Sequence, residues 1–148
     1  MLTRRAALIL LAGATAPGPA LGAGPAVVVY KSPSCGCCGG WVTLMRRAGF
    51  TAEVRSVNDV SAVLARQGVP ETLASCHVST VAGYAVVGHV PPQDVRALLA
   101  EKPKALGIAV PGMPAGSPGM EQPDGRREAF DTLLVLPGGR TRVFRRHA

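Results

Sequence analysis

Three cysteines lie within four positions of this sequence, at Cys35, Cys37 and Cys38. No packing requirement explains such a cluster, so we interpret it as a chemical site. Cys35 and Cys38 form a C-x-x-C pair, a spacing that prepares a reactive thiolate at the N-terminus of a helix. The additional thiol of Cys37 favours a soft metal instead, and thiolate ligands select Cu(I) in particular. A structural zinc site would normally need two separated pairs of ligands.

A second group of candidate ligands follows later in the chain, with Cys76 next to His77 and then His89. A histidine without other ligands nearby is more commonly a surface or hydrogen-bonded residue than a metal ligand. Beside four thiols, a ligand role for one of these two histidines and a purely structural role are equal alternatives. His147 near the C-terminus has no such neighbours. Two disulfides, with three possible pairings, are the structural alternative for four cysteines in an oxidising compartment.

Two methionines lie in a segment that proline and glycine keep out of helices and sheets. Residues 110–121 read VPGMPAGSPGME and contain Met113 and Met120. A thioether in such a loop can lie over a Cu(I) site, or Met113 can simply pack against the domain. The sequence leaves both alternatives open.

The pattern of apolar residues predicts the elements that position these side chains. A β-branched run typical of a buried strand precedes the cysteines, and apolar residues at helical spacing follow them. The expected order is strand, helix, strand, helix, strand, strand, helix, over residues 26–30, 39–48, 51–57, 59–67, 78–81, 84–90 and 92–102. Residues 104–125 are expected to be irregular, and residues 130–136 and 141–144 to form a terminal hairpin.

This order is that of an α/β, thioredoxin-like mixed sheet flanked by helices. The cysteine cluster then occupies the turn between the first strand and the first helix, with its last members at the helix N-terminus. In such a fold the segment before the hairpin lies against this turn, so Cys76 is expected to approach Cys35, Cys37 and Cys38. His89 is expected near the same end of the sheet.

Residues 1–22 are interpreted as a signal peptide. Arg4 and Arg5 precede a short apolar run at residues 6–12, and small residues at Ala20 and Gly22 fit a cleavage site. The paired arginines also fit a twin-arginine export signal loosely. The apolar run is far shorter than the roughly 20 residues that span a bilayer. We therefore expect an exported, periplasmic protein with a single domain at residues 23–148 and no membrane span.

The basic charge of the chain does not indicate a nucleic-acid partner. Without residues 1–22, the sequence keeps 14 basic and 9 acidic side chains, a formal charge of +5. Much of the excess is in a terminal arginine run that has no aromatic residues for stacking bases. An exported protein also meets little nucleic acid, and a charge run is usually a solvated face.

Four ordered motifs resemble those of the CopG-type periplasmic metal-binding proteins. They are KSPSCGCCGGW from Lys31, SCH from Ser75, GYAVVGHVP from Gly83 and VPGMPAGSPGME from Val110. The resemblance extends from about Val27 to Phe144. One departure is Ala82, where the family often has a second glycine before the glycine that occupies position 83.

The resemblance implies a thioredoxin-like protein of copper resistance that binds copper ions and acts beside other periplasmic copper-handling proteins. Redox activity toward the bound copper is a further expectation from the resemblance. By position, it makes Cys35, Cys37 and Cys38 the ligands of the cluster, and it adds further motif residues as candidate ligands: Cys76, His77, His89, Met113 and Met120. A thiol-disulfide oxidoreductase in which Cys35 attacks and Cys38 or Cys37 resolves is the alternative. The third interpretation is a structural or binding domain whose four cysteines form two disulfides.

Overall fold

The computed structural model describes residues 24–148 of the chain. The predicted signal peptide, residues 1–22, lies outside this part and stays a prediction. Within the described part, no helix has the length and apolar character needed to cross a membrane.

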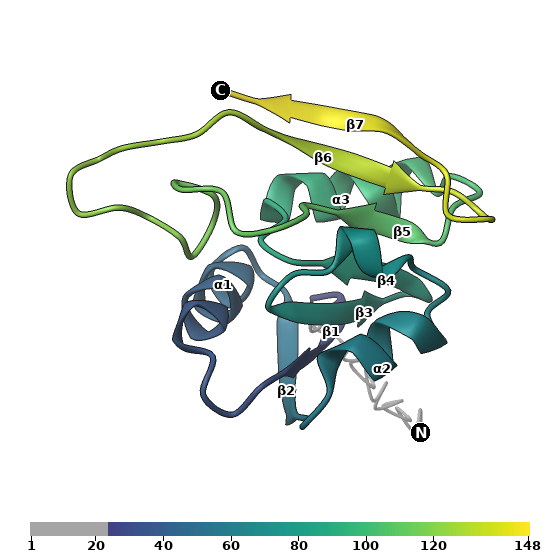
Figure 1. The fold of residues 1–148 in the computed structure, drawn as a ribbon, viewed down its shortest axis with the longest axis horizontal. Coiled ribbons are helices and arrows are strands. Elements are labelled where there is room, and N and C mark those ends of the chain that lie inside the picture. The colour runs from purple at the N-terminus through teal and green to yellow at the C-terminus, as the bar shows by residue number, and fades with distance from the viewer. Residues whose placement is uncertain (1–23) are drawn as a thin grey trace, which may run out of the picture.

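Seven strands form one mixed sheet in the order β2-β1-β3-β4-β5-β6-β7 (Figure 1). β1 pairs in parallel with β2 and β4 with β5, and the other four pairings are antiparallel. In chain order the elements are β1 Ala26–Lys31, α1 Gly36–Arg47, β2 Thr51–Ser56, α2 Val60–Arg66, the 3-10 helix η1 Glu71–Leu73, β3 His77–Val81, β4 Tyr84–Val87, α3 Pro92–Glu101, β5 Gly107–Ala109, β6 Phe130–Val135 and β7 Thr141–His147. The predicted thioredoxin-like α/β class is confirmed, including the flanking helices, the Gly/Pro/Met-rich loop and the C-terminal hairpin.

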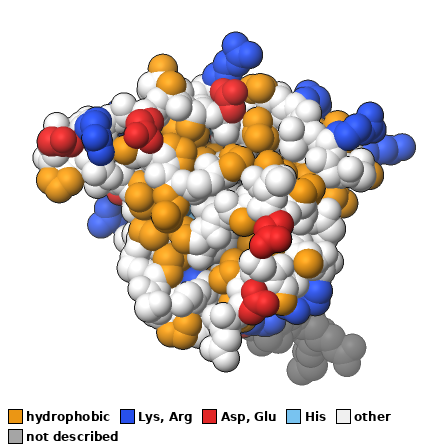
Figure 2. Space-filling model, in the orientation of Figure 1, with side chains coloured by type: hydrophobic (Ala, Val, Ile, Leu, Met, Phe, Trp, Pro, Cys, Tyr) orange, Lys and Arg blue, Asp and Glu red, His pale blue; other side chains and the backbone are white. Residues whose placement is uncertain are grey.

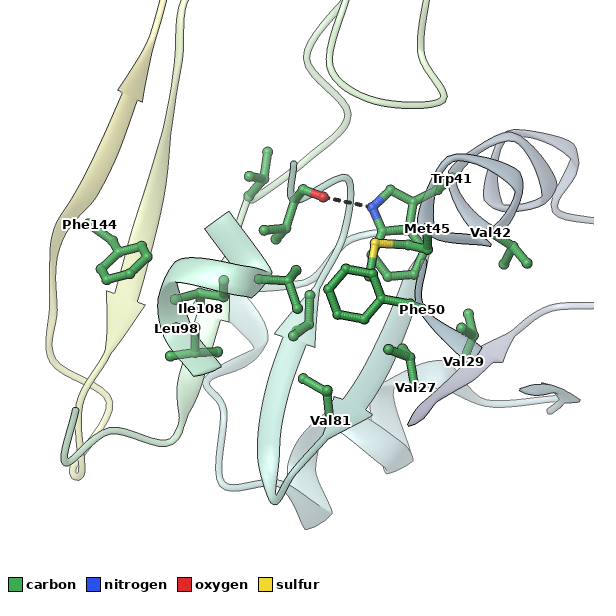
Figure 3. Close-up of a cluster of buried hydrophobic side chains, with 14 of the residues drawn as sticks. Val27, Val29, Trp41, Val42, Met45, Phe50, Val81, Leu98, Ile108 and Phe144 are labelled. Carbon is green, nitrogen blue, oxygen red and sulfur yellow. Dashed lines mark hydrogen bonds between the residues drawn. The ribbon is translucent and has the colours of Figure 1, made fainter. Parts of the chain in front are cut away.

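Two hydrophobic clusters cover opposite faces of the sheet. The larger one joins α1 and α3 to the strands, through side chains such as Trp41, Met45 and Leu98 (Figure 3). The smaller one joins α2 and η1 to the other face, through Val63 and Leu73 among others. Because the side chains of a strand alternate between faces, β3 contributes Val81 to the first cluster and Val78 to the second.

The first cluster fixes the position of α1, the helix that follows the cysteine cluster. Trp41 is fully buried, and its indole Nε1 donates a hydrogen bond to the carbonyl oxygen of Val90 at 2.8 Å (Figure 3). A buried Trp needs such a partner for its N–H group. This bond ties the first helix to the segment between β4 and α3, where His89 lies.

Three local predictions need correction. The first helix begins at Gly36 rather than at Gly39, so Cys37 and Cys38 are helical. Residues 104–125 were expected to be irregular, yet Gly107–Ala109 form β5, a strand too short and too rich in small residues to show a periodic pattern. The 84–90 strand ends at Val87, since Gly88 turns the chain with a φ of 73°.

The departure at Ala82 lies in the turn between β3 and β4. Ala82 has a φ of 47° and Gly83 a φ of 84°, so both residues adopt the left-handed conformation of a tight hairpin. A glycine at position 82 would adopt this conformation without the steric cost that alanine bears. The departure therefore affects only this turn, which lies far along β3 from Cys76.

Candidate metal centre

The cysteine cluster occupies the start of α1. Cys35 is the N-cap residue, and its backbone N–H donates to the carbonyl oxygen of Ser32 at 3.1 Å. Cys37 and Cys38 lie in the first helical turn, whose free N–H groups and positive dipole end favour negatively charged sulfur. Cys38 is buried, whereas Cys35 and Cys37 are partly exposed.

Cys35 and Cys38 form a disulfide, and the thiols of Cys37 and Cys76 are free. This pairing matches the C-x-x-C spacing. It differs from the two-disulfide alternative, because only two of the four cysteines are bridged. The Sγ of Cys37 is 3.5 Å from that of Cys35 and 3.7 Å from that of Cys76. One thiol thus lies between the bridge and the second free cysteine.

Cys76 is held against this cluster by the sheet. It directly precedes β3, which pairs with β1 so that His77 lies opposite Lys31, the last residue before the cysteine turn. The backbone carbonyl oxygen of Cys76 is 3.6 Å from the Sγ of Cys38. The antiparallel register therefore places Cys76 beside residues about 40 positions earlier, as the thioredoxin-like order predicts.

Two imidazoles complete the cluster from the other side of Cys76. Its Sγ is 3.0 Å from Nε2 of His89 and 3.4 Å from Nδ1 of His77. Two groups of possible metal-ligating atoms result, each with its atoms within 4.8 Å of one another, and they share Cys76: the four cysteines, and Cys76 with His77 and His89. The set offers soft sulfur and borderline nitrogen donors.

Hydrogen bonding fixes the tautomer of His89. Its Nδ1 is 2.8 Å from the carbonyl oxygen of Pro118, which can only accept, so Nδ1 carries the proton and donates. Burial lowers the pKa of His89, although the bond to Pro118 opposes this effect. In the neutral ring Nε2 then presents its lone pair toward Cys76, which is the orientation a metal ligand needs.

His77 is fully buried between aromatic rings. Its ring centroid is 4.7 Å from that of Trp41 and 5.1 Å from that of His89. Burial, and then the nearby charges of His89 and Lys31, lower the pKa of His77 to about 3. Its Nε2 is a buried nitrogen without a hydrogen-bond partner among the described residues. His77 is therefore a neutral imidazole at neutral pH, the form that binds metals.

The environment of Cys76 disfavours its thiolate when no metal is present. Burial, followed by the hydrogen bond and charge of Cys37, raises the pKa of the Cys76 thiol to about 12. A metal that binds this sulfur must therefore displace a proton, since the thiolate is the ligand.

The two candidate methionines and His147 lie in other parts of the structure than the cysteine cluster. Met113 is 52% exposed in the loop after β5, and Met120 is partly buried in the same loop. His147 lies away from the cysteines, where its Nε2 donates to Oδ2 of Asp94 at 2.8 Å and its ring stacks on Phe130. This agrees with the sequence, which gave His147 no role in the site.

Two contributors to the site had no signal of their own in the sequence. The carbonyl of Pro118 orients His89, and the ring of Trp41 packs on His77. A backbone carbonyl acts through its position, which no residue type encodes. The motif that contains Pro118 is visible in the sequence, but its contact with His89 depends on how the loop folds back.

The chain is similar to known proteins over most of its length. A family model described as a protein of unknown function, DUF411, matches residues 73–120. Two solved structures described as copper resistance protein copG, forms 2 and 1, share 38% and 39% sequence identity with the chain at TM-scores of 0.80 and 0.78. These matches cover 84% and 83% of this chain and 99% and 98% of those chains. Among curated proteins, none matches the chain significantly.

Proposed function

Because the chain belongs to the CopG family of copper resistance proteins, we propose that it binds copper, mainly as Cu(I), and contributes to copper resistance or homeostasis. The observation that carries this proposal is the gathering of four cysteine sulfurs and two imidazoles around Cys76. Thiolates are the preferred ligands of Cu(I), and imidazole nitrogen suits copper in either oxidation state.

The proposed ligands are Cys35, Cys37, Cys38 and Cys76, with His77 and His89 as nitrogen donors. Cys76 belongs to both groups of ligating atoms. Its sulfur can therefore bridge two ions, or bind one ion together with either the other cysteines or the two histidines. Met113 and Met120 are additional candidate ligands, since their loop bonds to His89 through Pro118 and can bring a thioether to the same end of the sheet.

Full use of the cysteines requires that the Cys35–Cys38 bond be opened. Two electrons and two protons convert this disulfide to two thiols, and an external dithiol can supply both by becoming a disulfide itself. Alternatively, two Cu(I) ions can each give one electron, which yields two Cu(II) ions and two thiolates. The second route would couple the bridge to copper oxidation and is the redox part of the proposal.

We place this activity in the periplasm. Residues 1–22 have the three parts of a signal peptide, and a disulfide at Cys35–Cys38 suits an oxidising compartment. The partners are then copper ions and other periplasmic copper-handling proteins. Nucleic acid is not among the expected partners.

Metal analysis tests the proposal. The protein is reduced and loaded with Cu(I) without oxygen, and its copper content is compared with that of a variant carrying Cys35→Ser, Cys37→Ser and Cys38→Ser. The matched control is Ser34→Ala in the same turn, which removes an exposed hydroxyl and no sulfur. We expect the triple variant to lose bound copper and the control to keep it. Equal copper content in all three proteins would refute the proposal.

Thiol-disulfide exchange is the second candidate function, and the disulfide itself favours it. Cys35–Cys38 closes the C-x-x-C pair at a helix N-terminus, with the free Cys37 thiol 3.5 Å from the Sγ of Cys35. In this function the Cys35 thiolate attacks a substrate disulfide and forms a mixed disulfide. Cys38 then attacks the Sγ of Cys35, releases the reduced substrate and forms the Cys35–Cys38 disulfide. Reduction of insulin by the metal-free, reduced protein is the assay, and an absence of turnover would reject this function.

A further inference from the structure

The segment between β5 and β6 forms an arm, defined here as residues 113–128, that extends from the body of the molecule. Figure 1 shows it as the long green loop, and Figure 2 shows charged side chains at its tip. Its two sides are tied to each other, since Ala115 N–H donates to Oε2 of Glu128 at 3.0 Å and Glu128 N–H donates to the carbonyl of Ala115 at 2.9 Å. The arm therefore holds its shape through its own bonds.

A compact turn lies within the arm. The backbone N–H and hydroxyl of Ser117 donate to the carbonyl of Pro114 at 3.1 and 2.6 Å, respectively. The N–H of Met120 donates to the carbonyl oxygen of Ser117, and the N–H of Gly116 donates to the carbonyl oxygen of Met120, both at 2.8 Å. These bonds close residues 114–120 into a unit that can move without losing its internal contacts.

This turn contacts the candidate metal centre at His89 and at the first turn of α1. The carbonyl of Pro118 accepts the Nδ1 proton of His89, and the next residue, Gly119, packs on the first turn of α1. A Cβ added at Gly119 would be 2.7 Å from the backbone nitrogen of Trp41 and 3.1 Å from the carbonyl oxygen of Cys37. A Cβ added at Gly40 would be 3.3 Å from the Cα of Gly119. Two glycines thus let the arm touch the helix that carries Cys37 and Cys38.

Little apolar surface holds the arm in place. Only two of its side chains are buried, those of Ala115 and Ser117, and both are small. Hollows of about 360 and 410 Å³ flank it, and both are lined by Gly116, Pro118 and Arg127. Just before the arm, Gly112 is anchored to the body of the molecule, since its N–H donates to the carbonyl of Ala74 at 3.3 Å and its carbonyl accepts from the Ser75 hydroxyl, so movement of the arm begins after this residue. Segments with so few buried contacts open at low free-energy cost.

We propose that the arm is a lid over the His89 side of the candidate metal centre, and that its opening sets the rate at which copper reaches and leaves the group formed by Cys76, His77 and His89. This inference rests on the proposed copper binding. In the closed arrangement the arm covers the backbone of the Cys37 turn and keeps His89 fully buried. Opening a lid speeds both entry and exit, whereas losing a ligand speeds exit alone, so faster entry is the signature of a lid even if the arm also carries candidate ligands.

Adjacent glycines in α1 provide a matched pair of variants. Gly40→Leu places a side chain against Gly119 and displaces the arm, whereas Gly39→Leu points into open space, with nothing within 4 Å of its Cβ. Both changes put the same residue into the same helix, and circular dichroism checks that both variants fold. If Gly40→Leu fails to fold, Gly119→Ala displaces the arm instead, because its Cβ would lie 2.7 Å from the backbone nitrogen of Trp41.

The readout is the rate of Cu(I) exchange between the reduced full-length protein and bathocuproine disulfonate, measured by stopped flow in both directions. We expect Gly40→Leu to speed both entry and exit by about tenfold or more, and Gly39→Leu to behave like the unmodified protein. Equal rates in the two variants, or a faster exit with unchanged entry, would overturn the lid. A failure of the unmodified protein to bind Cu(I) would instead refute the proposed function.

Discussion

Nε2 of His89 lies 3.0 Å from the Sγ of Cys76, while Nδ1 of the same ring donates to the carbonyl of Pro118 at 2.8 Å. The second bond determines the geometry of the first, because it fixes the proton on Nδ1 and leaves the Nε2 lone pair facing the thiol. In the metal-free protein the Cys76 thiol can donate its proton to this nitrogen. An ion that replaces this proton meets a sulfur and a nitrogen that are already oriented.

The two nitrogens of His89 can be separated by substitution. In His89→Asn, the amide N–H group can still donate to Pro118, but no nitrogen replaces Nε2. We expect Cu(I) affinity to fall by about tenfold or more with little change in thermal stability, because a ligand is lost while the contact with the loop is kept. Competition titration against a Cu(I) chelator measures this. An unchanged affinity would remove His89 from the ligand set.

Burial of neutral His77 makes the stability of the metal-free protein depend on pH. The pKa of His77 is about 3 in the fold, below the ordinary value of 6.5, so the unfolded chain takes up a proton first as the pH falls. The free energy of unfolding should therefore decrease below pH 6.5, by up to about 1.4 kcal/mol per pH unit. Denaturant unfolding at pH 7 and pH 5, followed by the fluorescence of Trp41, measures the slope.

His77→Phe is the variant that checks this pH effect. Phe keeps an aromatic ring against Trp41 and has no titrating nitrogen. The loss of stability between pH 7 and pH 5 should be smaller in this variant. The same slope in both proteins would mean that other groups cause the effect.

The pairing of the cysteines predicts the number of accessible thiols. Protein isolated without reductant should contain two free thiols, those of Cys37 and Cys76, and reduction should raise the number to four. Alkylation under denaturing conditions followed by mass spectrometry counts the thiols, and peptide mapping identifies them. A second bridge between Cys37 and Cys76 would contradict this prediction and support the two-disulfide alternative.

The methionines of the loop can be tested separately from the fold. Met113→Leu and Met120→Leu keep side chains of similar size without the thioether sulfur. We expect either change to lower Cu(I) affinity, while thermal stability shifts little because Met113 is exposed and Met120 is only partly buried. Identical chelator titrations for both variants and the unmodified protein would show that neither thioether is a ligand.

β5 depends on a glycine that has no room for a side chain. A Cβ at Gly107 would overlap the carbonyl oxygen of Ala85, its partner residue in β4. We expect Gly107→Ala to destabilise the protein by about 2 kcal/mol or more, because the β4–β5 pairing must separate. Gly39→Ala, which meets no atom within 4 Å, should leave stability the same or higher. Thermal or denaturant unfolding of both variants provides the comparison.

Much of the fold could be predicted from local patterns. The run of Val27, Val28 and Val29 predicts β1, and the spacing of Trp41, Leu44 and Met45 predicts α1, since periodicity reflects which face is buried. β5 could not be predicted in this way. Its three residues become a strand only because β4 and β6 lie on either side of them.

The sequence by itself determined the donor types and their local setting: three thiols at a strand-to-helix turn, Cys76 beside His77 at the start of a strand, and His89 after the hairpin. Only the tertiary structure decided that Cys35 bonds to Cys38, that Cys37 lies between the bridge and Cys76, and that Pro118 orients His89. The physical reason is distance along the chain. Spacing fixes neighbours within one turn or strand, whereas contacts between distant segments depend on sheet register and on how the loop folds back.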